Sequence, residues 1–465
     1  MATTTTTIPA PSATTLPATT IAAGTSSADV ARQAAVLEAF THAWSNYRER
    51  AWGADEIRPV TGDRSNEWGG LAATMIDALD TLWLMGLKDD FRAARDWIKD
   101  NFKPAESNWD GSTFEITIRY IGGLLAAYEF SNDKLFLDKA EEVAVRLFPA
   151  FDTPSGLALT TVNLRSGRAT NPSWNGAQCV LAEFGTLGLE WRALSKYTGN
   201  PIYREKVDRI AAVLERQTSG LLPTFFNPQT GQPSNAHVTY GARGDSYYEY
   251  LLKQWVQSGK RDVTSKRLYD LAIKDTLARL VKRTQLNNLA YLIEMDGTSP
   301  INKMDELACF FAGMLTLSGD DAMLPLAEDI AHTCWLMFNT TATGLAPEII
   351  NFPADRDIAP QAPHNLLRPE TVESLFYLWR RTRNEKYRER AWRIFQSWNA
   401  NARVAYGFSG IHDVTHMPPN HNNRQESFFF AETLKYLYLT FSPDDALSLD
   451  EFVFNTEAHP MRIWR

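Results

Sequence analysis

Apolar residues recur with the 3.6-residue period of an α-helix along most of this 465-residue chain. Fourteen segments after residue 30 carry that period. We expect helices over residues 31–51, 70–86, 88–101, 113–130, 133–149, 175–197, 200–217, 244–258, 262–283, 304–318, 320–339, 369–383, 386–403 and 425–441. The chain is therefore predicted to be all-α, with its helices arranged as seven pairs.

The predicted helices alternate between two kinds. Segments such as LAATMIDALDTLWLMGL and ESFFFAETLKYLYLTF are apolar on nearly all sides, whereas NEKYRERAWRIFQSWNA has one charged face. A helix that is apolar all round is buried, and an amphipathic helix lies at the surface. We therefore expect an inner ring of helices wrapped by an outer ring, forming one toroidal domain over residues 29–465.

Four longer connections separate some of these helices, at residues 150–173, 218–243, 284–303 and 340–367. They contain short runs of alternating polarity, such as GLALTTVNL and LAYLIEM, which predict small β-hairpins. We expect these hairpins on one face of the toroid, where they would rim or plug one end of the ring.

Composition narrows the classes of function. The net charge is −8 and no basic stripe stands out, which argues against nucleic-acid binding. No run of 18 apolar residues predicts a transmembrane helix. The uncharged stretch MATTTTTIPAPSATTLPATTIAAG lacks the basic and apolar regions of a signal peptide, and we expect residues 1–28 to form a disordered tail.

Carboxylates interrupt the apolar segments that are predicted to be inside. They are Glu67, Asp77, Asp80, Glu115, Glu183, Asp245, Glu249, Asp305, Glu306, Glu370, Glu373, Glu426 and Glu432. Burial of an unpaired carboxylate is unfavourable, so one such residue alone is typical of a salt bridge in a core. Because so many lie near the starts of inner helices, we predict a shared polar cavity at one end of the toroid.

Three stretches show this most clearly. In STFEITIRY, Glu115 and Arg119 are four residues apart on one helical face, in surroundings too apolar for an exposed ion pair. In GARGDSYYEY, Asp245 falls where a helix cap or a first-turn acid is expected. In LLRPETVES, Pro-Glu starts a helix and puts Glu370 and Glu373 three residues apart in its first turn. Two like charges this close indicate a site or a neighbouring cation.

Carboxylates in a cavity together with many aromatic residues are typical of a sugar site. Aromatic residues make up 12% of the chain, and aromatic faces stack on the C–H faces of pyranose rings. A pair of carboxylates can hydrolyse a glycoside, one as acid and the other as the base that activates water. The chain has no GxSxG motif, and no Walker or Rossmann motif stands in a strand–helix context.

The same residues give the chain a family resemblance. The motifs YRERAWGADEIRPVTG, NEWGGLAATMIDALDTLWLMGL, STFEITIRYIGGLLAAYE, LAEFGTLGLEWRALSKYTGN, GARGDSYYEYLLKQW, LLRPETVESLFYLWR, ESFFFAETLKYLYLTFS and FNTEAHP occur in that order between about residues 36 and 460. The chain resembles the class I α-1,2-mannosidases of glycoside hydrolase family 47. The resemblance implies an (αα)7 barrel plugged at one end by a C-terminal hairpin, a bound Ca²⁺ and inversion at the anomeric carbon.

The resemblance also implies roles for individual residues. Glu115 matches the catalytic acid, Glu370 the base and Asp245 a third catalytic carboxylate, and the assignment of acid and base among the three is open. Thr456 in FNTEAHP matches the direct Ca²⁺ ligand, through its hydroxyl and its carbonyl oxygen. Waters and sugar hydroxyls complete the metal shell, and the carboxylates implied to hold them are Glu370, Glu373, Glu432 and Glu457.

Further positions are implied to contact the sugar. They are Arg119 and Arg368 as donors to hydroxyls, Phe428 as a stacking platform, and Glu183 and Glu67 as additional candidates. Glu306, in MDELACFF, stands where many family members have a histidine that faces the mannose-binding cavity. This departure leaves the branch or subsite preference open.

The chain has three cysteines, whose spacing matches no zinc site. The resemblance implies a disulfide between Cys309 and Cys334, which requires an oxidising compartment. Cys179 would then be a free, buried thiol. We expect a secreted or periplasmic monomer without a membrane anchor.

Three functions remain under comparison. The complete set of acids together with Thr456 favours a Ca²⁺-dependent inverting exo-α-1,2-mannosidase, acting on α-1,2-linked mannose in oligosaccharides or N-glycans. The first alternative is a mannose-binding recognition module with weak or no hydrolysis. The second is another toroidal enzyme, such as an (α/α)6 glycosidase or an epimerase, which would have six helix pairs and no terminal threonine–calcium motif.

Overall fold

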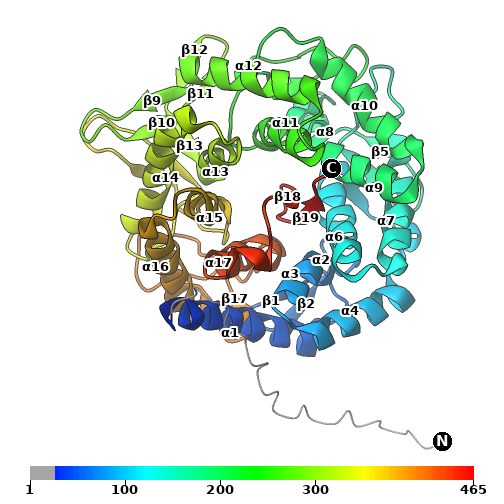
Figure 1. Cartoon of the computed structure of the whole chain (residues 1–465), viewed down its shortest axis with the longest axis horizontal. Helices are drawn as coiled ribbons and strands as arrows, with labels where there is room; N and C mark the ends of the chain where they lie inside the picture. Colours follow the sequence, from blue (N-terminus) through cyan, green and yellow to red (C-terminus); the bar gives the residue numbers. More distant parts are fainter. Residues whose placement is uncertain (1–26) are drawn as a thin grey trace, which may run out of the picture.

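The protein forms a ring of helices with a small hairpin in its centre (Figure 1). The computed structural model describes residues 27–465. The tail expected at residues 1–28 therefore lies outside the described residues, except for its last two, which begin the first helix. None of the described helices is both long and apolar enough to cross a membrane.

Seven amphipathic helices form the outer ring. They are α1 (Ser27–Arg50), α4 (Lys88–Asn101), α7 (Lys134–Leu147), α10 (Pro201–Glu215), α12 (Val263–Arg279), α14 (Leu324–Asn339) and α16 (Glu385–Asn401). Four of them are capped by a side-chain oxygen that accepts a hydrogen bond from a first-turn amide. The capping residues are Asp133, Asn200, Asp262 and Asn384.

The inner ring consists of seven helical layers, some of them broken. They are α2–α3 (Ala73–Asp77, Leu79–Leu84), α5–η2–α6 (Thr113–Glu115, Ile116–Ile121, Gly122–Ser131), α8–α9 (Leu181–Phe184, Gly188–Thr198), α11 (Asp245–Gln257), α13 (Phe310–Leu317), α15 (Glu370–Thr382) and η7–α17 (Phe429–Thr433, Leu434–Thr440). The segments η2 and η7 are π-helical, a geometry that recurs at functional sites. With the outer helices these layers make seven pairs among the described residues, which confirms the predicted (αα)7 barrel.

The helix predicted over residues 175–197 begins later than expected. Residues 176–180 are not helical, because Gly176 and Ala177 have φ of 70° and 59°, in the left-handed region. Strand β6 (Cys179–Val180) follows and pairs with β7 (Phe225–Phe226) before helix α8 begins. The apolar pattern of this strand is too short to be distinguished from a helical turn.

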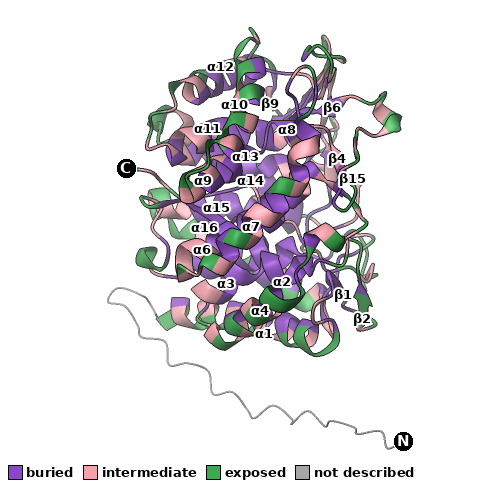
Figure 2. Ribbon diagram, turned by 90° about the vertical axis from the view of Figure 1, so that its right-hand side faces the viewer, coloured by how far each residue is buried: buried purple, intermediate pink, exposed green. Residues whose placement is uncertain are grey.

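Small antiparallel sheets occupy the connections between helices. They are β1–β2 (Glu56–Arg58, Asp63–Ser65), β3–β4–β5 (Asp110–Ser112, Thr161–Asn163, Ala169–Thr170), β8–β11–β12 (His237–Val238, Glu294–Asp296, Ser299–Ile301), β9–β10 (Val281–Arg283, Ala290–Leu292), β13–β14–β15 (Lys303–Asp305, Ile349–Asn351, Ala359–Ala362) and β16–β17 (Arg403–Val404, Gly407–Phe408). Figure 2 shows β1, β2, β4, β6 and β15 on one side of the molecule, which confirms the expected hairpins at one end of the barrel.

The C-terminal hairpin lies inside the inner ring (Figure 1). Strands β18 (Phe452–Phe454) and β19 (Pro460–Arg462) pair with Phe454 opposite Pro460, so that NTEAHP is the connecting turn. The glycine pair at the start of α6 makes room for this turn. A Cβ atom on Gly122 would lie 2.7 Å from the side-chain nitrogen of Asn455, which no ordinary packing allows.

Two further contacts hold the barrel together. Helix α1 closes the barrel against α16, where Arg388 and Asp29 form an ion pair of 2.9 Å. A disulfide joins Cys309, just before α13, to Cys334 of the outer helix α14, with Cα atoms 5.9 Å apart. Cys179 is free and buried, as expected, and burial raises the pKa of its thiol to about 11.

Candidate active site

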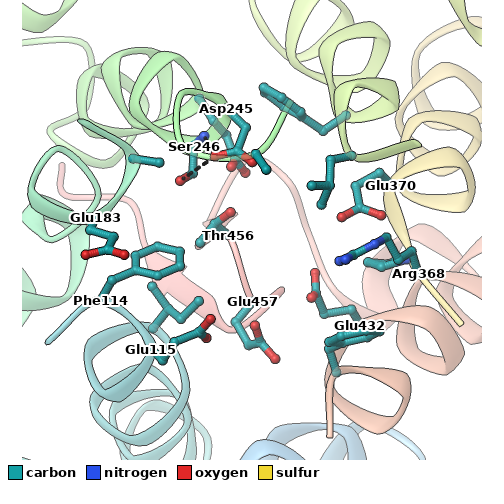
Figure 3. A pocket seen from close by; sticks show the side chains of 18 of the residues that line it. Phe114, Glu115, Glu183, Asp245, Ser246, Arg368, Glu370, Glu432, Thr456 and Glu457 are labelled. Carbon is teal, nitrogen blue, oxygen red and sulfur yellow. Dashed lines mark hydrogen bonds between the residues drawn. The ribbon is translucent and has the colours of Figure 1, made fainter. Parts of the chain in front are cut away.

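A cavity of about 380 Å³ lies at the end of the barrel where the inner helices begin, above the C-terminal hairpin (Figure 3). Twelve of the residues proposed from the sequence line it. They are Glu115, Arg119, Glu183, Asp245, Glu249, Arg368, Glu370, Glu373, Phe428, Glu432, Thr456 and Glu457. The predicted shared cavity is thus present.

Glu115 and Glu183 stand on one wall of the cavity. Glu115 ends the short helix α5, whose first turn is capped by the Ser112 hydroxyl accepting from the Glu115 amide at 3.2 Å. Its carboxylate accepts a hydrogen bond of 2.8 Å from Nε of Arg119, as the spacing in the sequence predicted. Burial and the nearby charge of Glu115 raise the pKa of Glu183 to about 7, although the neighbouring Thr160 hydroxyl and the charge of Arg243 act in the opposite direction. This wall therefore carries two acids: Glu115 is hydrogen-bonded to Arg119, whereas one carboxyl oxygen of Glu183 has no hydrogen-bond partner.

Asp245 is the first residue of α11, where the sequence placed it. The preceding Gly244 offers no side-chain cap, and Oδ1 of Asp245 accepts a hydrogen bond of 2.7 Å from the amide of Ser246. Burial raises the pKa of Asp245 to about 7, and the charge of Glu249 adds to the shift while the Ser246 amide opposes it. Asp245 is therefore a carboxyl group that holds a proton near neutral pH.

Glu370 faces the cavity from the opposite side, beside Arg368 (Figure 3). Leu367, just before them, has φ of 67°, a strained backbone conformation of the kind that persists at functional sites. Nε of Arg368 donates to Glu348 at 2.5 Å, which fixes the guanidinium. Burial and the adjacent carboxylate of Glu306 hold the pKa of Glu370 well above its usual range, against the opposing charge of Arg368.

Glu306 does not line the cavity. It is buried behind Glu370, and its Oε1 accepts from the amide of Thr371 at 3.2 Å and from the Thr371 hydroxyl at 2.7 Å. Helix α15 has Pro369 at its cap position and no cap of its own, so Glu306 supplies the missing acceptor from the neighbouring inner helix. The expectation that Glu306 faces the cavity is therefore corrected: it supports the helix that carries Glu370.

Phe428 lies between two arginines at the cavity wall. The guanidinium carbons of Arg119 and Arg368 are each 5.8 Å from the centroid of its ring. Arg119 is also 5.0 Å from the ring of Trp68. These cation–π contacts hold the arginines in fixed orientations while Phe428 presents its remaining surface to the cavity.

The turn NTEAHP forms the floor of the cavity. Asn455 shapes the turn, because its Oδ1 accepts from the amides of Glu457 at 2.9 Å and His459 at 2.7 Å. The amide of Thr456 donates to the Tyr250 hydroxyl at 3.4 Å. Within residues 27–465, neither the hydroxyl nor the carbonyl oxygen of Thr456 has a hydrogen-bond partner, so both are free to bind a ligand.

A buried ion network anchors the turn from below. His459 contacts Asp80 through Nδ1 at 3.0 Å and Asp77 through Nε2 at 3.3 Å, and all three side chains are inaccessible to solvent. Nζ of Lys435 lies 2.5 Å from Asp80 and donates to the carbonyl of Ala458 at 2.6 Å. Asp77 and Asp80 were expected among the cavity acids, and the structure instead pairs them beneath the floor. The sequence showed the acids but not their partners.

A second buried cation lies beside the floor. Lys253 is ion-paired with Glu249 and lies 3.7 Å from Glu373, and it donates to the carbonyl of Asn455 at 3.4 Å. Burial and the charge of Glu249 raise the pKa of Glu373 to about 7, although Lys253 opposes the shift. Spacing within one helix predicts the Lys253–Glu249 pair, but not its contact with the turn.

The donor set fits a hard cation at Thr456. Two uncharged oxygens of Thr456 face a cavity with the carboxylates of Glu370, Glu432 and Glu457 around it (Figure 3). One oxygen each of Glu370 and Glu183 is buried without any hydrogen-bond partner. No three His, Cys, Asp or Glu side chains converge on a common metal position in residues 27–465. An ion here would thus bind threonine oxygens and water, the kind of oxygen shell that Ca²⁺ accepts.

Asp305 and Glu426 do not line the cavity, although the sequence placed them among its acids. Glu67 does not line it either. It is exposed in the loop after β2, ion-paired with Arg58 and 3.7 Å from Arg424. Glu67 precedes both the helix predicted from residue 70 and the observed α2, which begins at Ala73, so it lies outside the helical wall. Cavity residues that the sequence reasoning did not assign include Phe114, Arg243, Ser246 and Phe310.

Comparison with known proteins agrees with the fold and the cavity. The family described as Glycosyl hydrolase family 47 matches residues 39–463. The chain is 46% identical over 447 residues to the mannosyl-oligosaccharide 1,2-alpha-mannosidase MNS1 of Arabidopsis thaliana, covering 94% of this chain and 79% of that protein. It is 45% identical over 451 residues to the endoplasmic reticulum mannosyl-oligosaccharide 1,2-alpha-mannosidase of Mus musculus, covering 93% of this chain and 68% of that protein.

A solved structure extends the comparison to three dimensions. The alpha-1,2-mannosidase from Trichoderma reesei superimposes with a TM-score of 0.89 at 31% identity, covering 94% of this chain and 99% of that one. The chain therefore belongs to glycosyl hydrolase family 47, and it is a glycoside hydrolase.

Proposed function

We propose that the protein is a Ca²⁺-dependent, inverting exo-α-1,2-mannosidase that removes terminal α-1,2-linked mannose from oligosaccharides or N-glycans. The observation that carries the proposal is the cavity in which Thr456 presents two free oxygens among proposed catalytic carboxylates. The names of the similar enzymes support the linkage and the sugar. The floor made by the C-terminal hairpin supports exo action, because a cavity closed at its base accepts only a chain end.

The carboxylates on the two walls suit an inverting hydrolysis. Glu115 gives its proton to the glycosidic oxygen while Glu370 accepts a proton from the attacking water. The water oxygen bonds to the anomeric carbon as the bond to the leaving sugar breaks on the opposite face, so the configuration inverts. Asp245, with its raised pKa, is the third catalytic carboxyl and the alternative acid.

Thr456 would hold the Ca²⁺, with water bridging to Glu370, Glu373, Glu432 and Glu457. When bound, the ion supplies positive charge beside these carboxylates and coordinates sugar hydroxyls. Positive charge favours the ionised form of a carboxyl group, so it would lower the pKa of Glu370 toward the range that a base requires. Arg368 acts on Glu370 in the same direction.

Arg119, Arg368 and Phe428 would position the terminal mannose. The two guanidinium groups are donors to hydroxyls, and the ring between them offers an apolar face for the sugar. Residues 29–465 would act as a single domain and as a monomer. The disulfide between Cys309 and Cys334 supports a location outside the cytoplasm, in a secretory or periplasmic compartment.

Mannose release from three mannobioses tests the proposal. The enzyme with Ca²⁺ should cleave the α-1,2-linked disaccharide and leave the α-1,3- and α-1,6-linked disaccharides largely intact. Glu370→Gln should bind the disaccharide without cleaving it. Binding of mannose without turnover by the wild-type protein would instead support the recognition module.

A further inference from the structure

The segment before β6 carries an aromatic side chain, Trp174, in contact with Arg243, which lines the cavity. Trp174 is 61% exposed, unlike the buried tryptophans of the core. Its ring meets Phe225 edge-on, with centroids 5.8 Å apart and an interplanar angle of 67°. The guanidinium of Arg243 lies 4.7 Å from the Trp174 centroid. An aromatic ring supported by two neighbours and still largely open to solvent is a surface suited to stacking.

The loop that carries Trp174 is held in place by its own hydrogen bonds. Asn171 accepts from the amide of Thr160 at 2.8 Å and donates to the carbonyl of Ala177 at 3.0 Å. Asn175 donates to the carbonyl of Gln178 at 2.9 Å. The exposure of Trp174 is therefore a property of a fixed loop, and its ring needs little ordering to bind a ligand.

Arg243 connects this ring to the proposed catalytic wall. It lines the cavity and has φ of 80°, and its carbonyl accepts from the amide of Ala182 at 3.0 Å. Its charge acts on Glu183, whose own neighbour is Glu115. A continuous series of side chains thus leads from the proposed acid, past Glu183 and Arg243, to the rim of the cavity at Trp174.

The leaving group extends along the same path, from Glu115 towards Trp174. A catalytic acid contacts the glycosidic oxygen, so the sugars beyond that oxygen extend outward on the acid's side. With the terminal mannose held above Thr456, the remainder of the glycan passes Glu183 and Arg243. A pyranose has an apolar C–H face that matches an open indole ring.

We propose that Trp174 is the platform of a rim subsite that stacks against a pyranose ring of the leaving-group chain, beyond the sugar next to the cleaved bond. The ligand class is an α-linked mannose oligosaccharide of three or more rings. Arg243 and Phe225 brace the platform. The subsite rests on the proposed mannosidase function and specifies how a longer substrate is held.

The test compares two substrates, α-1,2-mannobiose and a linear α-1,2-linked mannotetraose. Trp174→Ala should lower the ratio of kcat/KM for the tetraose to kcat/KM for the disaccharide by about two- to twelvefold, the range for loss of an aromatic contact. Because stacking far from the reacting bond is the same in ground and transition states, the loss should appear in KM rather than kcat. Trp174→Phe should retain most of the wild-type ratio.

A matched control is Val263→Ala, at the start of the outer helix α12, where the side chain is 74% exposed. Its ratio should equal that of the wild type. A Trp174→Ala ratio equal to the wild-type ratio would overturn the rim subsite while leaving the mannosidase in place. Failure of the wild-type enzyme to cleave either substrate would overturn the proposed function and the subsite with it.

Discussion

Buried acids occur at two levels of the barrel, and the two levels differ in how the charges are compensated. Beneath the floor, Asp80 has Lys435 and His459 as direct partners. Burial alone would raise the pKa of Asp80, but the charges of Lys435 and His459 outweigh it, and the pKa lies below its ordinary value. In the cavity, burial holds the pKa values of Glu370 and Glu432 well above their usual range.

The acids beneath the floor are paired with protein cations and stabilise the fold. The cavity acids have incomplete partners and are available to a ligand. A buried carboxylate whose charge is neutralised by cationic partners is compatible with a stable fold. Removal of one of these partners lowers the free energy of unfolding strongly. A carboxylate that lacks a partner disfavours its charged form and gains most from an external cation or a polar sugar. The turn NTEAHP belongs to both levels, because His459 is anchored below and Thr456 is free above.

The largest expected effect is a loss of stability on substitution of an acid beneath the floor. Asp80→Asn leaves the Lys435 ammonium without its buried counter-charge, so the free energy of unfolding should fall by about 3–5 kcal/mol. Urea denaturation of the metal-free protein measures it. The double variant Asp80→Asn with Lys435→Met should lose less than the sum of the two single variants. Additive losses would show that the two residues do not act as a pair.

Substitution of a cavity acid should instead reduce activity without reducing stability. Glu370→Gln should lower kcat by at least ~10²-fold, the usual contribution of an acid or base group, with no loss of stability. Replacement removes a carboxyl whose charged form is unfavourable here, so the urea midpoint should be equal to or above that of the wild type. Glu142→Gln, on the outer helix α7, is the control for rate and stability. Equal destabilisation by Glu370→Gln and Asp80→Asn would contradict the claim that only the acids beneath the floor stabilise the fold.

Thr456 should connect the upper level to the metal. At a Ca²⁺ concentration 100 times the Kd, binding stabilises the folded wild-type protein by about 2.7 kcal/mol, and EDTA should abolish this gain. Thr456→Ala should show a much smaller response to Ca²⁺ at the same concentration. Thermal unfolding with and without Ca²⁺ measures the difference. An unchanged response in Thr456→Ala would place the ion elsewhere.

The last expected effect is on the pH dependence of stability. Because the pKa of Asp245 is raised to about 7, its folded state binds a proton that the unfolded chain has lost above about pH 4. The free energy of unfolding of the metal-free protein should therefore fall as pH rises from about 4 to 7. Asp245→Asn should reduce that slope by about 1 kcal/mol per pH unit. A slope identical to that of the wild type would show that Asp245 is ionised throughout this range.

Much of the fold followed from local pattern. The 3.6-residue period and the alternation of buried and amphipathic helices predicted seven pairs, and hairpins were expected in the long connections. The strand at Cys179 was not predicted, because a segment of two residues is too short to show a period of alternation. Glu67 was expected at the sugar, but it precedes the predicted helix, and no local pattern indicated its ion pair with Arg58.

The site was predicted as a set of acids but not as two levels. Asp77 and His459 are 382 residues apart in sequence, and nothing local in the chain pairs them. Glu348 lies in a connection rather than in an inner helix, so its hold on Arg368 had no sequence signal. Glu306 was expected to face the sugar, and its capping of α15 depends on how two inner helices pack.

Proton NMR during digestion of α-1,2-mannobiose tests the proposed chemistry most directly, with the anomeric signals followed before mutarotation. With Ca²⁺ present, β-mannose should appear first, because water attacks the face opposite the leaving sugar. EDTA should stop the reaction, and added Ca²⁺ should restore it. Initial release of α-mannose, or full activity in a protein shown to be free of metal, would contradict the assignment of Glu370 as base and of Thr456 as the Ca²⁺ ligand.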